Sequence, residues 1–296
     1  MKPPAFSYHD PRSTGEVLNL LTSLDNAKLL AGGQSLMPML NMRFVLPDHV
    51  IDLNRVAELS YIREAAGALE SGAIEIGAMT RQRDIEFSDL IRSRCPLMHE
   101  AIRQVGHRQT RNRGTLGGSL CHLDPAAELV AVAATLDASI TVAGRNGSRT
   151  IGFADFPVAY MTPALGPDEL LVGARFPCWR DSHGYAFVEF SRRHGDFAIV
   201  AAAALIEEDG AGKVTRAALT LGGMGPAPIR AREVEQALIG EIIGEQRLRE
   251  LCEPLREVEA MDDIHAPASY RRQLATVLSR RALNKAHERI AARAAS

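Results

Sequence analysis

The chain has 296 residues, of which 46% are hydrophobic, 24% charged and 5% aromatic, a composition typical of a globular protein with one large or two ordinary domains. Its 34 Lys and Arg nearly balance its 36 Asp and Glu, for a formal net charge of −2, which excludes a global positive field for nucleic acid or an anionic membrane. Four cysteines without a C-x-x-C pair, Cys95, Cys121, Cys178 and Cys252, exclude a sequence-coded zinc or iron–sulfur site, so any redox chemistry must use an organic cofactor.

The first part of the chain alternates short apolar runs with helical patterns, which predicts an α/β arrangement. Residues 28–31 and 50–53 are predicted to be buried strands, with a helix over residues 34–43 between them. Residues 73–76 alternate like a further strand. They lead to Thr80, which is predicted to cap a helix.

A second group of elements completes the N-terminal half. The helical pattern of residues 124–136 has an Asp at its cap, a Pro at its first position and an acidic first turn, so Asp124 is expected to begin a helix. The predicted elements here are helices over 95–105 and 124–136 and strands over 139–142 and 169–176. The pattern then changes, which places a domain boundary within residues 177–184.

The C-terminal part is predicted to be an α+β domain, a three-stranded antiparallel sheet followed by helices. A hairpin turn is expected at residues 208–212. The predicted strands are 185–190, 198–207 and 214–222, and the predicted helices are 231–239, 245–253 and 268–292. The longest apolar run, 198–206, is too short to cross a bilayer, and the first residues lack the apolar stretch of a signal peptide. The expected location is the cytoplasm, with reduced thiols.

The common nucleotide fingerprints are absent. The G-A-G-K segment at residues 210–213 lacks the first Gly and the final Ser or Thr of a P-loop. The G-G-M-G segment at 222–225 runs into prolines rather than a helix, which excludes a Rossmann motif there. Cys121 and His122 are adjacent in sequence and nothing orients the imidazole, so they are not expected to form a catalytic dyad.

Two other glycine pairs have the chemistry of a phosphate site. A-G-G-Q-S (31–35) stands between a predicted strand and a predicted helix, and T-L-G-G-S (115–119) precedes the helix expected at Asp124. Backbone N–H groups at such turns bind anions, and Gly lets the anion approach closely. Each segment alone also fits an ordinary Gly-rich turn, but together they predict a pyrophosphate held by backbone donors and hydroxyls.

Three segments carry a resemblance to a known family. AGGQSLMPMLNMR (31–43), RNRGTLGGSLCHLDPAAEL (111–129) and RRHGDFA (192–198) resemble the motif regions of the FAD-binding medium subunit of molybdenum hydroxylases, which include carbon monoxide dehydrogenase and quinoline 2-oxidoreductase. The resemblance implies a non-Rossmann fold, with a two-part FAD-binding domain over residues 1–177, divided near residue 55, and a C-terminal α+β domain over 178–296.

The resemblance also implies a cofactor site. Its two Gly-Gly segments would hold the FAD pyrophosphate, the stretch from Asp124 to Glu128 would approach the ribityl and ribose hydroxyls, and Phe197 would lie against the isoalloxazine ring. From the residues alone, Asp124 and Glu128 equally suit a helix start, and Phe197 suits a core. The implied site comprises Ala31, Gly32, Gly33, Gln34, Ser35, Leu36, Thr115, Gly117, Gly118, Ser119, Asp124, Glu128, Leu171 and Phe197.

A basic cluster precedes the second Gly-Gly segment: His107, Arg108, Arg111 and Arg113. It is either a solvated face, a source of charge for the diphosphate or part of a docking surface. The Arg-rich helix expected over residues 268–292 is a second candidate for that surface.

The family implies a division of labour. The medium subunit takes electrons from two [2Fe–2S] clusters of a small subunit and passes them to an external acceptor, while a large molybdenum subunit hydroxylates the substrate; a dimer of heterotrimers is expected. Gln34, where carbon monoxide dehydrogenases have His, favours an N-heteroaromatic substrate. The alternatives are a non-catalytic dinucleotide-binding or docking protein and a self-sufficient FAD oxidase.

Overall fold

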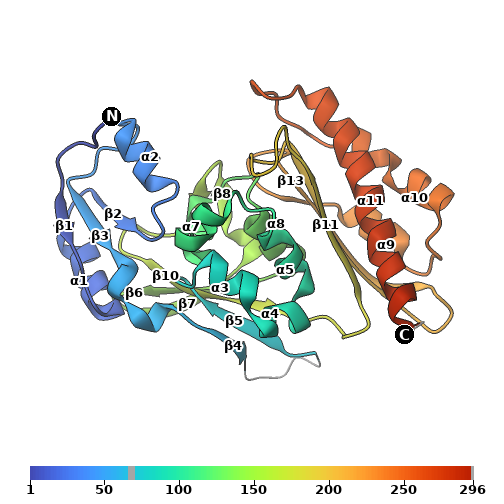
Figure 1. Ribbon diagram of the computed structural model, residues 1–296, viewed down its shortest axis with the longest axis horizontal. Helices are drawn as coiled ribbons and strands as arrows, with labels where there is room; N and C mark the ends of the chain where they lie inside the picture. The colour runs from blue at the N-terminus through green and yellow to red at the C-terminus, as the bar shows by residue number, and fades with distance from the viewer. Residues whose placement is uncertain (66–70, 295–296) are drawn as a thin grey trace.

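Three main β-sheets succeed one another along the longest axis of the computed structural model, which describes residues 1–65 and 71–294 (Figure 1). The N-terminal sheet has the order β1-β3-β2, the central sheet β4-β5-β10-β6-β7 and the C-terminal sheet β11-β12-β13-β14. Within the described residues, no helix combines the length and hydropathy needed to cross a membrane.

The N-terminal sheet is parallel, because each of its strands returns through a helical connection. Val17 of the first helix and Ile51 of the central strand are fully buried in its small core. The elements are β1 (Ser7–His9), α1 (Thr14–Ser23), β2 (Ala27–Leu30), α2 (Leu36–Asn41) and β3 (His49–Asp52), with short 3-10 helices at Leu53–Arg55 and Ala57–Leu59. The helix expected over residues 34–43 is thus shorter, and the residues before it form a loop.

The central sheet is antiparallel, with helices packed on it. Its strands are β4 (Ile62–Ala65), β5 (Ala73–Gly77), β6 (Ser139–Gly144), β7 (Gly147–Gly152) and β10 (Leu170–Pro177). The helices are α3 (Gln82–Phe87), α4 (Asp89–Arg94), α5 (Pro96–Ile102), α6 (Arg108–Arg113), α7 (Leu116–His122) and α8 (Glu128–Thr135), followed by a 3-10 turn at Phe153–Asp155 and the hairpin β8 (Pro157–Ala159) and β9 (Thr162–Pro163). Every residue of α8 is buried, as expected of a helix enclosed on all sides.

The C-terminal sheet is covered on both faces. Ala201 and Ala203 join the core that contains α5 and α8, while Ala202 and Ala204 join a second core against α11. This explains the nearly continuous apolar run in the second strand. The elements are β11 (Gly184–Phe190), β12 (Val200–Glu208), β13 (Val214–Gly222), β14 (Ile229–Arg230), α9 (Arg232–Leu238), α10 (Glu245–Cys252), a 3-10 turn at Glu253–Glu257, and α11 (Ala268–Ala294).

The predicted α+β class is confirmed, and the predicted strands and helices follow one another as expected, but the sequence did not predict β1, α1, β4, α4, α6, α7, β7, β8 and β9. The structure also corrects three local expectations. The C-terminal sheet has a short fourth strand, β14. Thr80 does not cap α3; its hydroxyl accepts from Tyr61 N (3.1 Å) and donates to Tyr61 O (2.9 Å), and Arg81 occupies the cap position. Asp124 does not begin a helix: its carboxylate accepts from Ala126 N (2.9 Å) in a turn, and α8 starts at Glu128.

The long helix α11 is bound to the central unit by its own basic side chains. Lys285 and Arg289 both pair with Glu100 of α5, and the Arg289 guanidinium also lies 4.1 Å from the centre of the Tyr185 ring. Arg271 is 2% exposed, and its guanidinium donates to Gly223 O (2.7 Å) and pairs with Asp263 (2.6 Å). The expectation that this Arg-rich helix offers a basic docking face is therefore wrong for these side chains.

The fit of α11 on the sheet depends on Gly184. A Cβ there would overlap the carbonyl oxygen of Ala286 in α11. We expect Gly184→Ala to lower the free energy of unfolding by about 1–3 kcal/mol, because overpacking forces the helix away from the sheet. Urea unfolding measures this change.

The matched control is Gly15→Ala in α1, where no atom lies within 4 Å of the added methyl. Its stability should be unchanged or up to about 1 kcal/mol higher. Equal stability of the two variants would contradict the close packing at Gly184.

Candidate functional site

The two Gly-Gly segments lie against each other, although about 80 residues separate them in sequence. A Cβ on Gly32 would overlap the Arg113 carbonyl oxygen and would lie 2.8 Å from Gly114 Cα, and a Cβ on Gly118 would lie 3.5 Å from Ala31 Cβ. Backbone therefore packs directly on backbone, which only glycine allows at position 32.

The backbone donors of the two segments differ. In the part of the chain that the structure describes, the N–H groups of residues 32–36 make no hydrogen bond, and Gly33 has a left-handed backbone with φ of 73°. In the second segment, Leu116 N donates to Thr80 O (3.1 Å), Gly117 N to Ala78 O (2.8 Å) and Gly118 N to Thr115 Oγ1 (3.0 Å). Free backbone donors thus come from the first segment only.

This corrects the expectation that backbone N–H groups of both segments face a ligand. Thr115 is the N-cap of α7, so the first turn of that helix is satisfied by the protein itself. What residues 115–119 can offer a ligand is the half-buried hydroxyl of Ser119. Gly117 instead allows close packing, because a Cβ there would lie 2.8 Å from both Ala78 Cβ and Ala78 O.

Two side chains that the motifs did not indicate hold the segments together. Asn54 Nδ2 donates to Ala31 O (3.0 Å), and its amide oxygen accepts from Arg81 Nη2. Arg81 Nη1 donates to Arg113 O, so one guanidinium links both segments. Burial and the neighbouring Arg113 lower the pKa of Arg81. Asn54 follows β3 and Arg81 follows β5 at some distance in sequence from either motif, and no pattern of spacing could have identified them.

The basic cluster is divided by the fold. Arg111 Nε lies 2.9 Å from Glu86 Oε2, and both side chains are more than four-fifths buried, so this charge is neutralised within the protein. Arg108 and Arg113 are exposed. Of the three alternatives for this cluster, neither a solvated face nor a charge for the diphosphate or a partner fits Arg111, because its charge is already paired.

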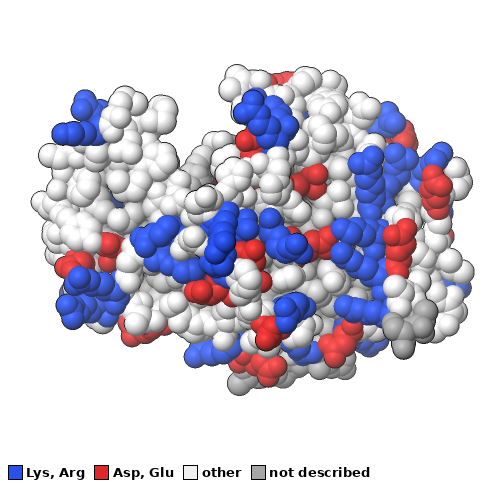
Figure 2. Space-filling view, in the orientation of Figure 1, with Lys and Arg blue, Asp and Glu red and all other residues white. Residues whose placement is uncertain are grey.

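The surface of the molecule has a hollow near α7. Figure 2 shows this hollow at the upper edge of the molecule, between the unit that carries α2 and the C-terminal unit, and Figure 1 places α7 and α8 below it. Phe197 lies in the connection between β11 and β12 and is 68% exposed, so the alternative that it is a core residue is wrong. Leu171 is 2% exposed in β10, and its neighbour Val172 accepts from Ala78 N (3.0 Å) beside Gly117.

Glu128 is the most unusual of the predicted residues. It is 7% exposed, and burial together with nearby Glu189 raises the pKa of its carboxyl to about 8. Arg111 counteracts this only in part. At neutral pH the carboxyl is therefore largely protonated in the protein without ligand.

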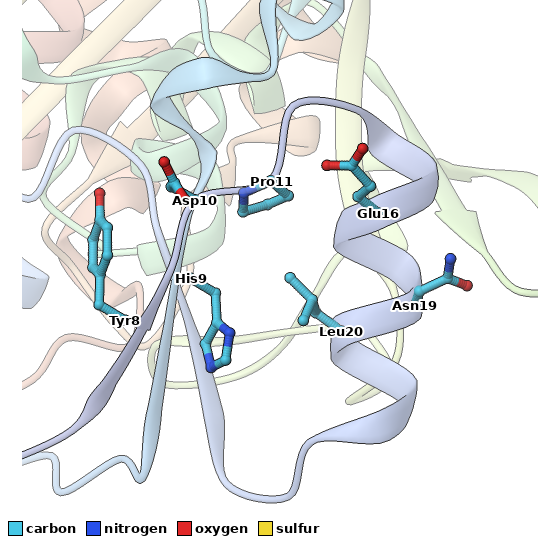
Figure 3. A pocket seen from close by; sticks show the side chains of 7 residues that line it. All are labelled: Tyr8, His9, Asp10, Pro11, Glu16, Asn19 and Leu20. Carbon is cyan, nitrogen blue, oxygen red and sulfur yellow. The ribbon is translucent and has the colours of Figure 1, made fainter.

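A separate open pocket of about 460 Å³ lies between β1 and α1 (Figure 3) and is lined by Tyr8, His9, Asp10, Pro11, Glu16, Asn19 and Leu20. No predicted site residue borders it. Two of its polar groups are already paired, since Tyr8 Oη donates to Asp52 (2.6 Å) and Asp10 pairs with Arg55 (2.8 Å). Across the described ranges, no cluster of His, Cys, Asp and Glu could hold a metal ion.

The burial of Glu128 predicts a pH-dependent stability of the ligand-free chain. The folded-state pKa is raised from 4.5 to about 8, so the carboxyl favours folding at low pH and progressively less as the pH rises towards 8. We expect Glu128→Gln to gain free energy of unfolding relative to the native chain when the pH rises from about 5 to about 8.

Urea unfolding at the two pH values measures this gain. Glu245→Gln, at a carboxylate that is 81% exposed, is the matched control and should follow the native chain at both. A parallel pH dependence of native chain and Glu128→Gln would show that Glu128 is ionised in the fold.

Comparison with known proteins identifies the family. Residues 4–179 match the family described as FAD binding domain in molybdopterin dehydrogenase, and residues 185–286 match the CO dehydrogenase flavoprotein C-terminal domain. The chain is 38% identical to 6-hydroxypseudooxynicotine dehydrogenase complex subunit alpha of Paenarthrobacter nicotinovorans, with 98% of this chain and 97% of that protein covered. It is also 38% identical to caffeine dehydrogenase subunit beta of Pseudomonas sp. strain CBB1, over 98% and 97% of the two chains.

A solved structure agrees with these relatives. Carbon monoxide dehydrogenase from Hydrogenophaga pseudoflava superimposes with a TM-score of 0.92 at 35% identity, over 98% of this chain and 99% of the other. Both parts of the chain match in order and over nearly the full length of the relatives. The chain therefore belongs to the family of FAD-binding medium subunits of the molybdenum hydroxylases, oxidoreductases in which it is the flavin-carrying partner of a small and a large subunit.

Proposed function

We propose that FAD lies in the hollow between α2 and the β11–β12 connection, with its pyrophosphate on the loop at residues 31–36. The observation that carries this assignment is the run of unpaired N–H groups at residues 32–36, directly after Ala31, whose Cβ lies 3.5 Å from the Cβ position of Gly118. Backbone donors at a glycine turn suit a dianionic pyrophosphate, and Gly33 provides the left-handed backbone that turns them to one side.

Three further groups complete the proposed site. Asp124 and Glu128 would accept hydrogen bonds from the polyol and ribose hydroxyls, and charged acceptors bind such hydroxyls strongly. The exposed ring of Phe197 would cover the isoalloxazine, a stacking contact worth about 0.5–1.5 kcal/mol beyond the buried area. Leu36 and Leu171 would contribute apolar contacts. The bound flavin supplies the redox chemistry, and the chain supplies binding, orientation and electrostatics.

The proposal extends to the complex. We place the electron donor in the [2Fe–2S] clusters of the small subunit and the hydroxylation in the large subunit, in a cytoplasmic dimer of heterotrimers. Four unpaired thiols support a reducing compartment. The exposed side chains of Arg103, Arg108 and Arg113 are candidates for contact with a partner. Figure 2 shows that basic side chains gather in a band across one face of the molecule.

We further propose an N-heteroaromatic substrate and a two-domain division. Relatives at 38% identity are named for caffeine and for 6-hydroxypseudooxynicotine, and Gln34 supports the same class. The domains are proposed at residues 1–177, divided near residue 55, and 178–296. Separate apolar clusters around Ile51 and around Leu283 support this division.

The pyrophosphate assignment predicts that Gly33→Val abolishes FAD binding. The left-handed φ of 73° disfavours a β-branched residue, and the added Cβ would lie 3.2 Å from Met37 Cγ, so the donor loop must change shape. The flavin-to-protein ratio of the purified variant measures the effect.

The control is Gly212→Val in the β12–β13 turn, which has a similar φ of 77° but no atom within 4 Å of the Cβ position. It carries the same backbone strain and should retain FAD. Full flavin occupancy in Gly33→Val would refute the assignment.

The subunit assignment predicts that the isolated chain binds FAD but oxidises no heteroaromatic substrate, because its described residues hold no metal cluster. When the chain is co-expressed with its small and large subunits, the same substrate should bleach the visible flavin absorbance. Substrate oxidation by the isolated flavoprotein at a comparable rate would overturn the proposed division of labour.

A further inference from the structure

The buried carboxyl groups of Glu128 and Glu189 form no ion pair within the described residues. Elsewhere buried charges are paired: Glu235 accepts from Leu219 N (2.7 Å) and binds Arg230 (2.8 Å), and Arg271 is held as described above. By contrast, Glu189 Oε2 is buried and accepts no hydrogen bond within residues 1–65 and 71–294. The Glu128 carboxyl accepts a hydrogen bond from its own backbone N–H and forms no ion pair within those ranges. A buried carboxyl whose acceptors are not fully matched destabilises the fold, so these two groups are expected to serve a ligand.

The fold brings these two acids to one place. Glu189 alternates with Val188 along β11 and shares the face of Phe187, which packs on the core containing α8. Its cross-strand neighbour is Ala201, which in turn lies opposite Gly222. Helix α8, which carries Glu128, approaches the sheet at the same place, next to Ala201 and Gly222.

Gly222 shows how closely α8 approaches there. A Cβ on Gly222 would lie 3.6 Å from Ala201 Cβ and 3.7 Å from Ala131 Cβ, one helical turn after Glu128. Residues three apart share a face of a helix, so Glu128 enters the same region from α8 as Glu189 does from β11. The electrostatic effect of Glu189 on Glu128 agrees with this proximity.

Both acids stand at the base of segments assigned to the cofactor. Glu128 begins α8, directly after the turn that Ala127 N closes by donating to Asp124 O (2.9 Å). Glu189 directly precedes the connection that carries Phe197, which is closed by the hydrogen bond from Ile199 N to Phe190 O (2.7 Å). Glu128 and Glu189 therefore lie between the turn at Asp124, which is proposed to bind the polyol, and Phe197, which is proposed to cover the ring.

We propose that Glu128 and Glu189 form a two-carboxyl acceptor site for hydroxyl groups of FAD, and that FAD binding releases a proton from this pair to the solvent. The inference rests on the proposed FAD site and adds Glu189 to it. A carboxylic acid loses its proton to the buffer and the resulting carboxylate accepts an O–H from the ligand. No bond within FAD is made or broken.

The direction of this linkage follows from the environment of the pair. Burial raises the pKa of Glu128 to about 8 and that of Glu189 to about 7, so both hold protons in the free protein below neutral pH. Hydrogen bonds donated by hydroxyls favour the charged form and lower both values. FAD binding should therefore tighten as the pH rises.

The proton released on FAD binding is expected to come from Glu128 and Glu189 rather than from other titratable groups nearby. Around Glu128, Asp124 raises its pKa and Arg111 lowers it, while Arg111 remains paired to Glu86. From α7, burial lowers the pKa of His122, which is therefore neutral near pH 7. On the elements packed against β11, Glu100 of α5 is neutralised by Lys285 and Arg289 of α11, and burial lowers the pKa of His99 of α5.

The test is calorimetric titration of the flavin-free full chain with FAD at about pH 6.5, in two buffers of different ionisation enthalpy. We expect release of about one proton per FAD bound and a Kd that falls by up to about tenfold per pH unit between pH 6 and 7. Infrared difference spectra of the native chain should show loss of a protonated carboxyl band on FAD addition, a readout that needs no variant.

Substitutions test whether the released proton comes from Glu128 and Glu189. Glu189→Gln should bind FAD more weakly with reduced proton release, and Glu245→Gln, remote and exposed, should match the native chain. FAD binding without proton release, or unchanged release in Glu189→Gln, would overturn the role of the pair while leaving the FAD site intact. Absence of FAD binding at every pH would overturn the proposed site itself, and the role of the pair with it.

Discussion

The contact of Gly32 with the backbone of Arg113 and Gly114 is the constraint on which the site depends. It joins the N-terminal unit to the central one at a distance that excludes any side chain. Because the two backbones touch, the residues that follow each of them, the loop at 32–36 and helix α7, open onto the same hollow. The bonds from Asn54 and Arg81 hold that contact in register.

From this contact follows an asymmetry in hydrogen bonding. Helix α7 is inserted beside β5, so the carbonyls of Ala78 and Thr80 and the hydroxyl of Thr115 occupy its first N–H groups. The loop before α2 has no such neighbour, and its donors remain available. The segment at residues 115–119 thus fixes how the two backbones pack, and the loop at residues 32–36 keeps N–H groups that can bind a ligand. A similar division holds for the buried charges: Glu235 and Arg271 have partners of opposite charge, whereas Glu189 Oε2 accepts no hydrogen bond within the described residues.

The C-terminal unit contributes to the candidate site because it is firmly packed against the central unit. Its sheet is covered by α11 on one face and by α5 and α8 on the other, and the pairs from Glu100 to Lys285 and Arg289 close the far end. Near the hollow, Gly223 N donates to Pro125 O (2.8 Å), and Arg271 binds both Gly223 O and Ile199 O. These bonds connect the turn before Glu128 to the connection that carries Phe197, so the two halves of the site are placed by one network.

The sequence by itself determined the class of fold, the more buried strands, the glycine segments and the absence of metal-ligand spacing, because each depends on local periodicity or residue type. The exposed or short strands β1, β4, β7, β8, β9 and β14 lack such periodicity and were not predicted. The continuous apolar run of β12 also predicts that both faces of this strand are buried. Only the tertiary structure decided which N–H groups are free, that Arg111 is neutralised by Glu86 and that Asp124 forms a turn ahead of α8. It also decided that Asn54 and Arg81 bind the backbone of residues 31 and 113, and that Glu189 acts electrostatically on Glu128. These outcomes depend on partners far away along the chain. A hydrogen bond or a desolvated carboxyl is set by what packs against it, and local sequence does not contain that information.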